Sequence, residues 1–262
     1  MEIAFLILMF VLGTCFGSFF CCEARRMHHK EISKKKLPSR SVCLKCGYKL
    51  KWYDNIPLVS WLSLKGKCRK CSKKIGVGEF ISELSVGFAF FLLALGFIIV
   101  SPEARFGEPP LLYINITLII VLVLSLLFLA VYDGLYGELP TILLTISIIC
   151  AIIIVSISDL SWEIILNYAA SVAILGGIYL LLYLVSKGKW VGDGDWLLGV
   201  AIGLTLKTPW LSLVALFLSN FIACLVMLPF SRGKNVKIPF GPFLVASFII
   251  VYSFADMLMN ML

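Results

Sequence analysis

Gly192-Asp193-Gly194-Asp195 places two carboxylates and two glycines between two apolar stretches, Leu180–Val185 and Trp196–Leu206. A carboxylate at the edge of a hydrocarbon layer is costly and therefore usually marks a functional site. The glycines let the backbone bend or approach a ligand closely. Because the following apolar stretch is shorter than the ~20 residues of a full span, either this helix is short or one or both carboxylates lie below the membrane surface.

A second acidic residue has a similar setting. Asp133 ends the apolar run Leu118–Tyr132 and precedes a turn that leads into a new helix. Considered alone, it would be an ordinary turn aspartate. Considered together with Asp195, it suggests a pair, and we predict that Asp133 and Asp195 face each other and carry out the chemistry.

Composition places the whole chain in a membrane. Of 262 residues, 60% are hydrophobic and the mean hydropathy is +1.00, whereas a soluble domain is nearer half apolar. Long strands of alternating polar and apolar residues are missing, which favours helices over a barrel. The first apolar run, Ile3–Phe20, lacks the basic start of a secretory signal peptide. The predicted fold class is an all-α polytopic membrane protein.

About eight transmembrane helices are predicted from hydropathy. The candidate spans are 3–22, 80–100, 111–132, 139–157, 163–186, 196–206 with its flanks, 209–230 and 240–260. If the loop 23–79 is placed inside, the inside loops together hold 21 Lys and Arg residues and the outside loops hold two. The positive-inside rule therefore predicts that this loop is cytoplasmic. The same topology places Asp133 and Asp195 on the cytoplasmic side.

The basic residues are concentrated in one block, because 16 of the 23 Lys and Arg residues lie between Arg25 and Lys74. Such a block can bind nucleic acid or anionic lipid. In a membrane protein the positive-inside rule accounts for it. We therefore expect membrane lipid, and no nucleic acid, as a partner.

The cytoplasmic loop contains two Cys-x-x-Cys pairs, separated by 21 residues. They are Cys43, Cys46, Cys68 and Cys71. This spacing lets both sulfurs of each knuckle reach one tetrahedral ion, so the pattern predicts a zinc site. Two disulfides, or idle thiols, are the alternatives, and a reducing compartment disfavours disulfides. Four protein ligands leave no open position, so the zinc is expected to be structural.

Two further features of this region have open interpretations. Trp52–Trp61 is expected to be an ordered loop with an aromatic surface that can lie on the bilayer, since Pro57 interrupts any helix. Glu83 follows, one turn into the second span. A carboxylate there needs a partner, and structural pairing with a loop cation and a ligand-binding role are both open.

Six motifs in order resemble the type IV prepilin peptidases, which are leader peptidases and N-methyltransferases of the bacterial cell membrane. The matching segments are Gly17-Ser18-Phe19 with Arg26, the cysteine pairs flanking Asp54-Asn-Ile-Pro-Leu-Val-Ser-Trp61, Glu83, Asp133 with Pro140, Gly192-x-Gly194-Asp195, and Ile238-Pro-Phe-Gly-Pro-Phe243. One departure is that Gly78-Glu79-Phe80 stands where the family has Arg-Tyr-Pro, in the region associated with the methyl donor.

The resemblance implies three functional regions. Residues 1–22 would be the first transmembrane helix, 23–79 a cytoplasmic zinc-binding loop associated with methyl transfer, and 80–262 a transmembrane aspartyl protease core. Asp133 and Asp195 would be catalytic. The implied location is the bacterial inner membrane, with multiple passes and a cytoplasmic active site.

The resemblance also implies the substrates. A prepilin or pilin-like protein would lose its basic leader, and S-adenosylmethionine would then methylate the new N-terminus. Glu83 and Arg26 are candidate residues for binding this cofactor. Two alternatives stay open, namely a leader peptidase without methyl transfer and a non-enzymatic zinc-knuckle scaffold or transporter.

Overall fold

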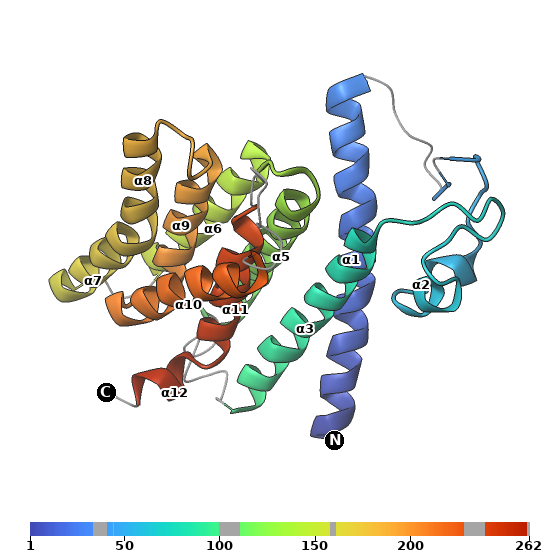
Figure 1. The fold of residues 1–262 in the computed structure, drawn as a ribbon. Coiled ribbons are helices and arrows are strands. Elements are labelled where there is room, and N and C mark those ends of the chain that lie inside the picture. Colours follow the sequence, from blue (N-terminus) through green and yellow to red (C-terminus); the bar gives the residue numbers. More distant parts are fainter. Residues whose placement is uncertain (34–40, 44, 100–110, 158–160, 228–238, 261–262) are drawn as a thin grey trace. The chain divides into compact units, whose positions relative to one another are not determined.

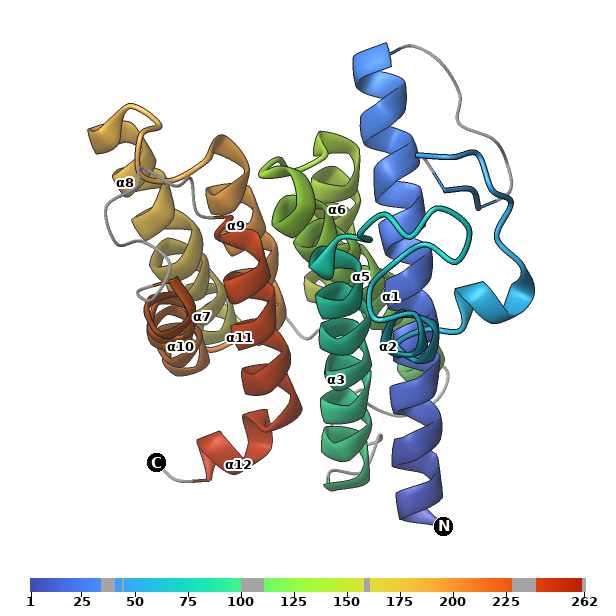
Figure 2. The ribbon, with the colours of Figure 1, turned by 45° about the vertical axis from the view of Figure 1, so that its right-hand side comes forward.

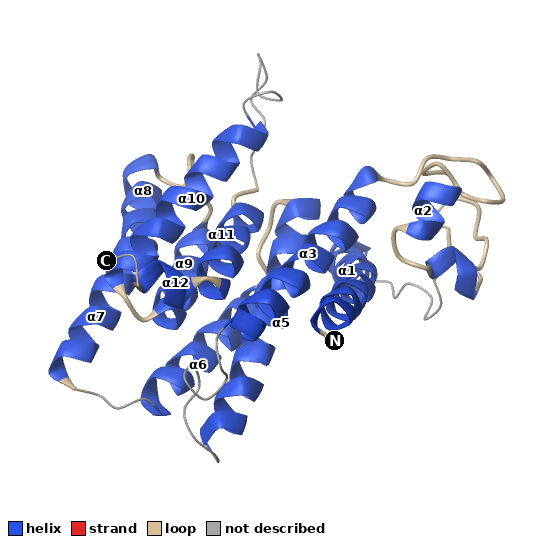
Figure 3. Cartoon of the chain, turned by 90° about the horizontal axis from the view of Figure 1, so that it is seen from below, coloured by secondary structure: helices blue, strands red, loops and turns tan. Residues whose placement is uncertain are grey.

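The computed structural model describes residues 1–33, 41–43, 45–99, 111–157, 161–227 and 239–260. These residues form helices joined by loops, and none of them lies in a strand (Figure 3). Two isolated β-bridges occur, both in the cysteine-rich loop. The predicted all-helical architecture is confirmed for this part of the chain. It divides into two compact units, Met1–Ala94 and Leu95–Leu262.

The first unit contains a long N-terminal helix, α1 (Glu2–Ser33), and most of α3 (Val77–Ile99). Helix α1 continues eleven residues beyond the predicted span 3–22. The extension is rich in good helix formers such as Glu, Ala, Arg, Met and Lys. An ion pair between Glu23 and Arg26, 3.3 Å apart, supports it at the i,i+3 spacing.

Small residues let α1 and α3 approach closely. A β-carbon added to Gly13 would lie 2.8 Å from the Val86 carbonyl oxygen, and one added to Gly17 would lie 2.7 Å from the Glu83 α-carbon. Phe16 stacks on Phe90 beside these contacts, with ring centroids 5.4 Å apart. In a membrane, helices associate mainly through such close packing.

The described part of the loop between these helices, residues 41–43 and 45–76, has helical structure of its own (Figure 1). It contains a 3-10 helix, η1 (Trp52–Asn55), and a short helix, α2 (Val59–Ser63). Pro57 lies between them, as expected of a residue that interrupts a helix. The segment predicted as a loop is therefore two short helices with a break.

The second unit is a helical bundle, and its helices are seen together in Figure 2. Helices α5 (Leu111–Tyr136) and α6 (Thr141–Ile157) pack against each other. The remaining helices are α7 (Trp162–Val172), a π-helical turn η2 (Ala173–Gly177), α8 (Ile178–Ser186), α9 (Asp193–Leu206), α10 (Pro209–Met227), α11 (Gly241–Ser253) and α12 (Ala255–Met259).

Helix α9 lies at the centre of this unit and contacts α6, α7, η2, α8, α10 and α11. Its glycines explain how so many elements reach it. A β-carbon on Gly199 would lie 2.7 Å from the Leu175 carbonyl oxygen, and one on Gly203 would lie 2.9 Å from that of Ser171. Leu198 and Ile202 are fully buried on the same helix. A short apolar helix can therefore serve as the core of the bundle.

Five helices among the described residues are long and apolar enough to cross a membrane. They are Glu2–Lys30, Val77–Ile99, Leu112–Tyr136, Trp162–Ser186 and Pro209–Met227. Thr141–Ile157 and Gly241–Ser253 are shorter apolar helices. Helices thus occur at all the predicted spans, but the count of about eight spans stays a prediction. The predicted ends at 100 and 228–230 lie outside the described residues.

Candidate metal centre and aspartyl site

The four loop cysteines converge on one point. The Sγ atoms of Cys43, Cys46, Cys68 and Cys71 all lie within 4.8 Å of one another. All four are free thiols, and the Cys43 and Cys71 sulfurs are 4.0 Å apart, about twice the S–S bond length of roughly 2 Å. The sequence-based expectation that the two pairs share one site is confirmed, and the disulfide alternative does not describe this structure.

Each cysteine pair lies in the same kind of backbone turn. The Gly47 N–H donates to the Cys43 carbonyl, and the Ser72 N–H donates to the Cys68 carbonyl. Both turns close with an antiparallel bridge, Val42 with Lys49 and Lys67 with Lys74. Gly47 and Ser72 have φ values of +69° and +55°. The two knuckles are therefore structural repeats, and only the first has the glycine that suits this left-handed position.

The donor set fits a zinc ion. Four thiolates at Zn–S distances of about 2.3 Å would place the sulfurs of a tetrahedral site about 3.8 Å apart, close to the observed 4.0 Å. Backbone N–H groups of Cys71 and Lys70 lower the pKa of the Cys68 thiol to about 7, which favours the thiolate that a metal requires. The cluster could therefore hold zinc through Cys43, Cys46, Cys68 and Cys71.

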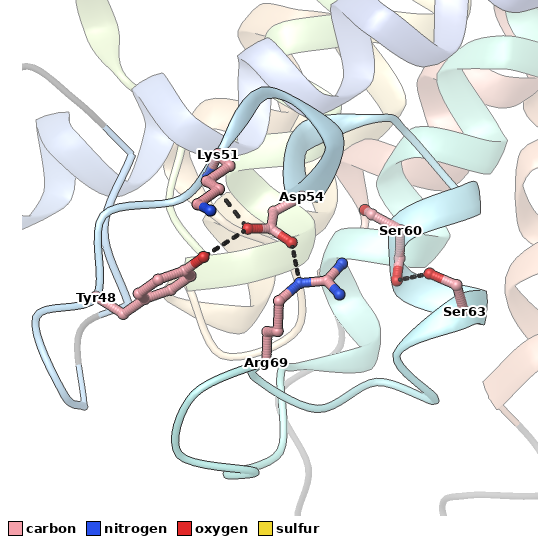
Figure 4. A network of polar contacts seen from close by, with 6 residues as sticks. All are labelled: Tyr48, Lys51, Asp54, Ser60, Ser63 and Arg69. Carbon is pink, nitrogen blue, oxygen red and sulfur yellow. Dashed lines mark hydrogen bonds and ion pairs between the residues drawn. The ribbon is translucent and has the colours of Figure 1, made fainter.

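A buried carboxylate joins the two knuckles (Figure 4). Asp54 of η1 accepts hydrogen bonds from the Tyr48 hydroxyl at 3.3 Å and from the Lys51 N–H at 3.1 Å, both in or beside the first knuckle. Its other oxygen accepts one from Arg69 Nε at 2.7 Å, within the second knuckle. Only 1% of the Asp54 side chain is exposed. By sequence, Asp54 is part of a family motif, and no local pattern assigns it a role.

Burial disfavours the Asp54 charge, but the bonds from Arg69, Lys51 and Tyr48 outweigh it and hold the pKa of Asp54 below its usual value. We expect Asp54→Asn to weaken the link that this side chain makes between the two knuckles. The amide lacks the negative charge that pairs with Arg69, and it has one acceptor oxygen where the carboxylate has two. The cost should be about 1–3 kcal/mol. Zinc should then leave at least about fivefold faster, as followed with a chromogenic chelator.

Asn55→Ala is the matched control for this substitution. Asn55 is the next residue of the same short helix, and its side chain is exposed. Zinc release from this variant should match that from the unsubstituted protein. Equal release rates for Asp54→Asn and Asn55→Ala would show that Asp54 does not stabilise the metal centre.

The two residues predicted for the methyl donor have different partners in the first unit. Glu83 Oε2 accepts a hydrogen bond from the Leu58 N–H at 2.7 Å, so it ties the loop to α3. Arg26 pairs with Glu23 on α1. Structural pairing, one of the two roles considered for Glu83, is therefore present, although with a backbone group instead of a loop cation. The assignment of Glu83 and Arg26 to S-adenosylmethionine stays a prediction.

Asp133 lies in the last turn of α5 and is 5% exposed. The Gly241 N–H at the start of α11 donates to its Oδ2 atom at 2.8 Å. A β-carbon on Gly241 would lie only 2.8 Å from that oxygen. A side chain at position 241 would therefore displace the carboxylate from this position. This contact links residues 108 positions apart, a separation that no local sequence pattern predicts.

Asp195 lies in the first turn of α9 and is 6% exposed. Its Oδ2 atom accepts a hydrogen bond from the Gly192 N–H at 2.9 Å, so the side chain reaches back to the residue that caps its own helix. Gly194 is buried against Leu139, where a β-carbon would approach to 2.7 Å. The two glycines of the motif therefore have distinct structural roles.

The second unit brings the two aspartates together. The Asp133 and Asp195 carboxylates are close enough to interact electrostatically, although they come from α5 and α9. Tyr179 is also close enough to interact with Asp195, and its ring packs on Phe240 with centroids 5.1 Å apart. The assignment of Asp133 and Asp195 as a facing catalytic pair stays a prediction, and this electrostatic contact supports it. Tyr179 was not predicted, because a buried tyrosine on an apolar helix carries no sequence signal of its own.

Comparison with known proteins gives a consistent result. A protein-family model described as "Bacterial Peptidase A24 N-terminal domain" matches residues 11–97 of this chain. The Prepilin leader peptidase/N-methyltransferase of Vibrio cholerae is 31% identical over 271 residues, covering 96% of this chain and 98% of that protein. The chain belongs to the prepilin leader peptidase/N-methyltransferase family.

Other members of this family match as well. The Myxococcus xanthus protein is 41% identical over 87 residues, which cover 33% of this chain and 25% of that protein. The Stutzerimonas stutzeri protein is 27% identical over 266 residues, which cover 93% of this chain and 88% of that protein. No solved structure matches. Membership of the prepilin leader peptidase/N-methyltransferase family, together with several apolar helices, indicates a multi-pass membrane protein of the inner membrane.

Proposed function

We propose that this protein cleaves the basic leader from prepilins and pilin-like proteins with Asp133 and Asp195 as a catalytic pair. The observation that carries this proposal is that two buried carboxylates, one from α5 and one from α9, lie close enough to interact electrostatically. Backbone N–H groups of Gly241 and Gly192 orient them. The relatives are named for prepilin leader cleavage and N-methylation, which supports the choice of substrate.

Two close carboxylates do not ionise together easily, so the pair would share one proton and titrate as a unit. The ionised member takes a proton from water, and the resulting hydroxide attacks the scissile carbonyl. The protonated member donates to the carbonyl oxygen, and a proton then passes to the leaving amine. The products are a leader with a free carboxylate and a mature pilin with a new N-terminal amine.

The topology of the substrate fits this arrangement. A prepilin carries a short basic leader followed by a hydrophobic helix, which would lie among the spans while the leader stays on the cytoplasmic side. The positive-inside distribution of Lys and Arg supports a cytoplasmic loop and active site. The predicted regions 1–22, 23–79 and 80–262 remain our proposed division of labour.

The second activity would be methylation of the new amine. S-adenosylmethionine supplies an electrophilic methyl group when bound, and Glu83 and Arg26 are kept as candidate binding residues. The zinc in the cysteine cluster is proposed to be structural, because four cysteines fill a tetrahedral coordination shell. Its contribution would be to the folding of the loop.

A peptidase without methyl transfer is the second candidate function. Glu79 lies in the segment that departs from the family pattern, and it forms an ion pair with Arg25 of α1. The family has Arg-Tyr-Pro where this chain has Gly78-Glu79-Phe80. The segment therefore carries a negative charge, paired with Arg25, where the family has a positive one. This observation is the reason to test the two activities separately.

The test is incubation of the purified protein in lipid vesicles with a leader-bearing prepilin and isotopically labelled S-adenosylmethionine. We expect mass spectrometry to show a cut after the leader glycine and one labelled methyl group on the mature N-terminus. If the prepilin is cleaved but neither its product nor an added pre-cleaved pilin gains labelled methyl, the protein is a peptidase without methyl transfer. Absence of cleavage by folded, zinc-loaded protein would contradict the proposed function.

A further inference from the structure

We propose that the loop segment Trp52–Leu64 is an interfacial membrane anchor, which seats the metal-binding loop on a lipid surface rich in anionic headgroups. The inference goes beyond the proposed function and does not depend on it. It rests on three features of the first unit: the depth of the segment beside α3, the exposure of its apolar side chains, and the distribution of charge around it.

Depth is set by two contacts between α2 and α3. The Leu58 N–H, at the start of α2, binds Glu83, and Trp61 packs on Phe80 with ring centroids 4.7 Å apart. Glu83 lies four residues beyond Glu79, which ion-pairs with Arg25 at the loop-bearing end of the helix. Four helical residues correspond to about 6 Å. Helix α2 therefore lies beside the first two turns of a candidate membrane span.

An exposed apolar side chain lies at this level on α3 itself. Ile81 lies between the two contact residues, Phe80 and Glu83, and is 58% exposed. A large apolar side chain exposed on a candidate membrane span suits contact with acyl chains. A second helix held at the same level would meet the boundary between headgroups and acyl chains.

The segment presents apolar side chains outward at this level. Val59 and Leu62 are 59% and 58% exposed, and their i,i+3 spacing places them on one face of α2. Trp61 of the same helix instead packs inward on Phe80. Trp52 is 78% exposed. Tryptophan is enriched at membrane–water interfaces, where its ring sits among the headgroups.

Charge complementarity identifies the partner. Residues 52–64 contain no Lys or Arg, and their one acid, Asp54, is buried and paired with Arg69. Exposed lysines flank the segment on both sides at Lys51 and Lys65. Six more exposed lysines of the same loop are Lys45, Lys49, Lys67, Lys70, Lys73 and Lys74. An apolar segment between lysines suits an anionic bilayer, since long basic side chains reach from its edge to the headgroups.

The same charge argues against the basic prepilin leader as the occupant. Residues 41–76 contain Asp54 as their one acidic residue, and its charge is already matched by Arg69. A cationic peptide would be repelled by the eight exposed lysines of this loop. Anionic lipid carries the opposite sign and is present continuously at the membrane surface.

The test uses a photoreactive benzophenone amino acid placed at Val59 or Leu62 in the full-length protein, without substrate. The protein is reconstituted in phosphatidylethanolamine/phosphatidylglycerol vesicles or in phosphatidylcholine vesicles. Lys70, an exposed residue between Cys68 and Cys71, is the matched control site. Zinc content verifies that each variant is folded. Illumination then reports acyl-chain adducts by mass spectrometry.

We expect lipid adducts at Val59 and Leu62 to exceed those at Lys70 in the anionic vesicles, because the first two sites lie on the exposed apolar face of α2. Lys51→Gln with Lys65→Gln should lower the yield at Val59 by at least about fivefold, the factor that one lysine contributes near such a surface. Equal yields at Val59 and Lys70 would overturn the anchor. Equal yields in anionic and phosphatidylcholine vesicles would overturn the anionic preference. Adducts that form only with added pilin would assign the surface to substrate.

Discussion

Replacing Asp133 or Asp195 with asparagine is expected to lower prepilin cleavage by at least about 10³-fold, because either change removes one of the two groups that must exchange protons with water and substrate. Because the pair acts as a unit, the double variant should be little slower than either single one. Asparagine keeps a carbonyl oxygen that can accept the bond from Gly241 or Gly192, so both variants should fold. The measurement is single-turnover cleavage in lipid vesicles.

Asp193→Asn is the matched control for these substitutions. Asp193 lies two residues before Asp195 in the first turn of α9, but its side chain is exposed. Exposed charges are screened by salt, so cleavage should stay within about tenfold of the unsubstituted rate. Near-normal cleavage by Asp133→Asn or Asp195→Asn would mean that the altered aspartate is structural and that the proposed mechanism is wrong.

The same pair of variants tests the non-enzymatic alternative. A zinc-knuckle scaffold or transporter would keep its cellular function when either aspartate became an amide. Pilus assembly in cells that carry only Asp133→Asn or Asp195→Asn separates these possibilities. We expect assembly to stop and unprocessed prepilin to accumulate in the membrane.

Cys68→Ser is expected to abolish zinc binding and to unfold the loop between α1 and α3. Structural zinc contributes about 10–16 kcal/mol to the folding of small zinc-finger peptides. Cys68 is the buried ligand of the cluster, and its knuckle also carries the Arg69 bond to Asp54. A loss of even about 3 kcal/mol would raise the population of the open loop more than 100-fold. Metal analysis and limited proteolysis of the loop measure the effect.

Cys224→Ser provides the comparison, since Cys224 is an exposed thiol of α10 in the other unit. Its zinc content and loop proteolysis should be unchanged. Helical circular dichroism should show that the bundle containing α5 and α9 survives in Cys68→Ser. A Cys68→Ser protein that retained zinc with a protease-resistant loop would contradict the four-cysteine site.

Local sequence was sufficient for the long apolar helices and for the convergence of the four cysteines. Uninterrupted apolar runs predict helices because no water is present to satisfy an open backbone, and helices form at each run. The Cys-x-x-Cys spacing predicts the convergence of four thiols because two residues between sulfurs suit one knuckle. Both the apolar runs and the cysteine spacing are set by residues close together in the chain, so the sequence alone reveals them.

Contacts between distant residues required the tertiary structure. The bond from Gly241 to Asp133 spans 108 positions, and no local pattern encodes it. The Leu58 bond to Glu83 gives a carboxylate with two possible roles a definite structural partner. The position of α9 at the centre of the bundle depends on its glycines, which admit neighbouring backbones closely.

Asp54 shows the division most clearly. By sequence it is a single acid in a basic, aromatic loop, a setting typical of a solvated residue. In the structure it is buried and joins Tyr48 of one knuckle to Arg69 of the other. Hydropathy and cysteine spacing determined that this protein is helical, lies in a membrane and carries a four-cysteine centre. Which carboxylates are buried, and what each one binds, was decided by packing, because burial depends on all the elements that surround a side chain.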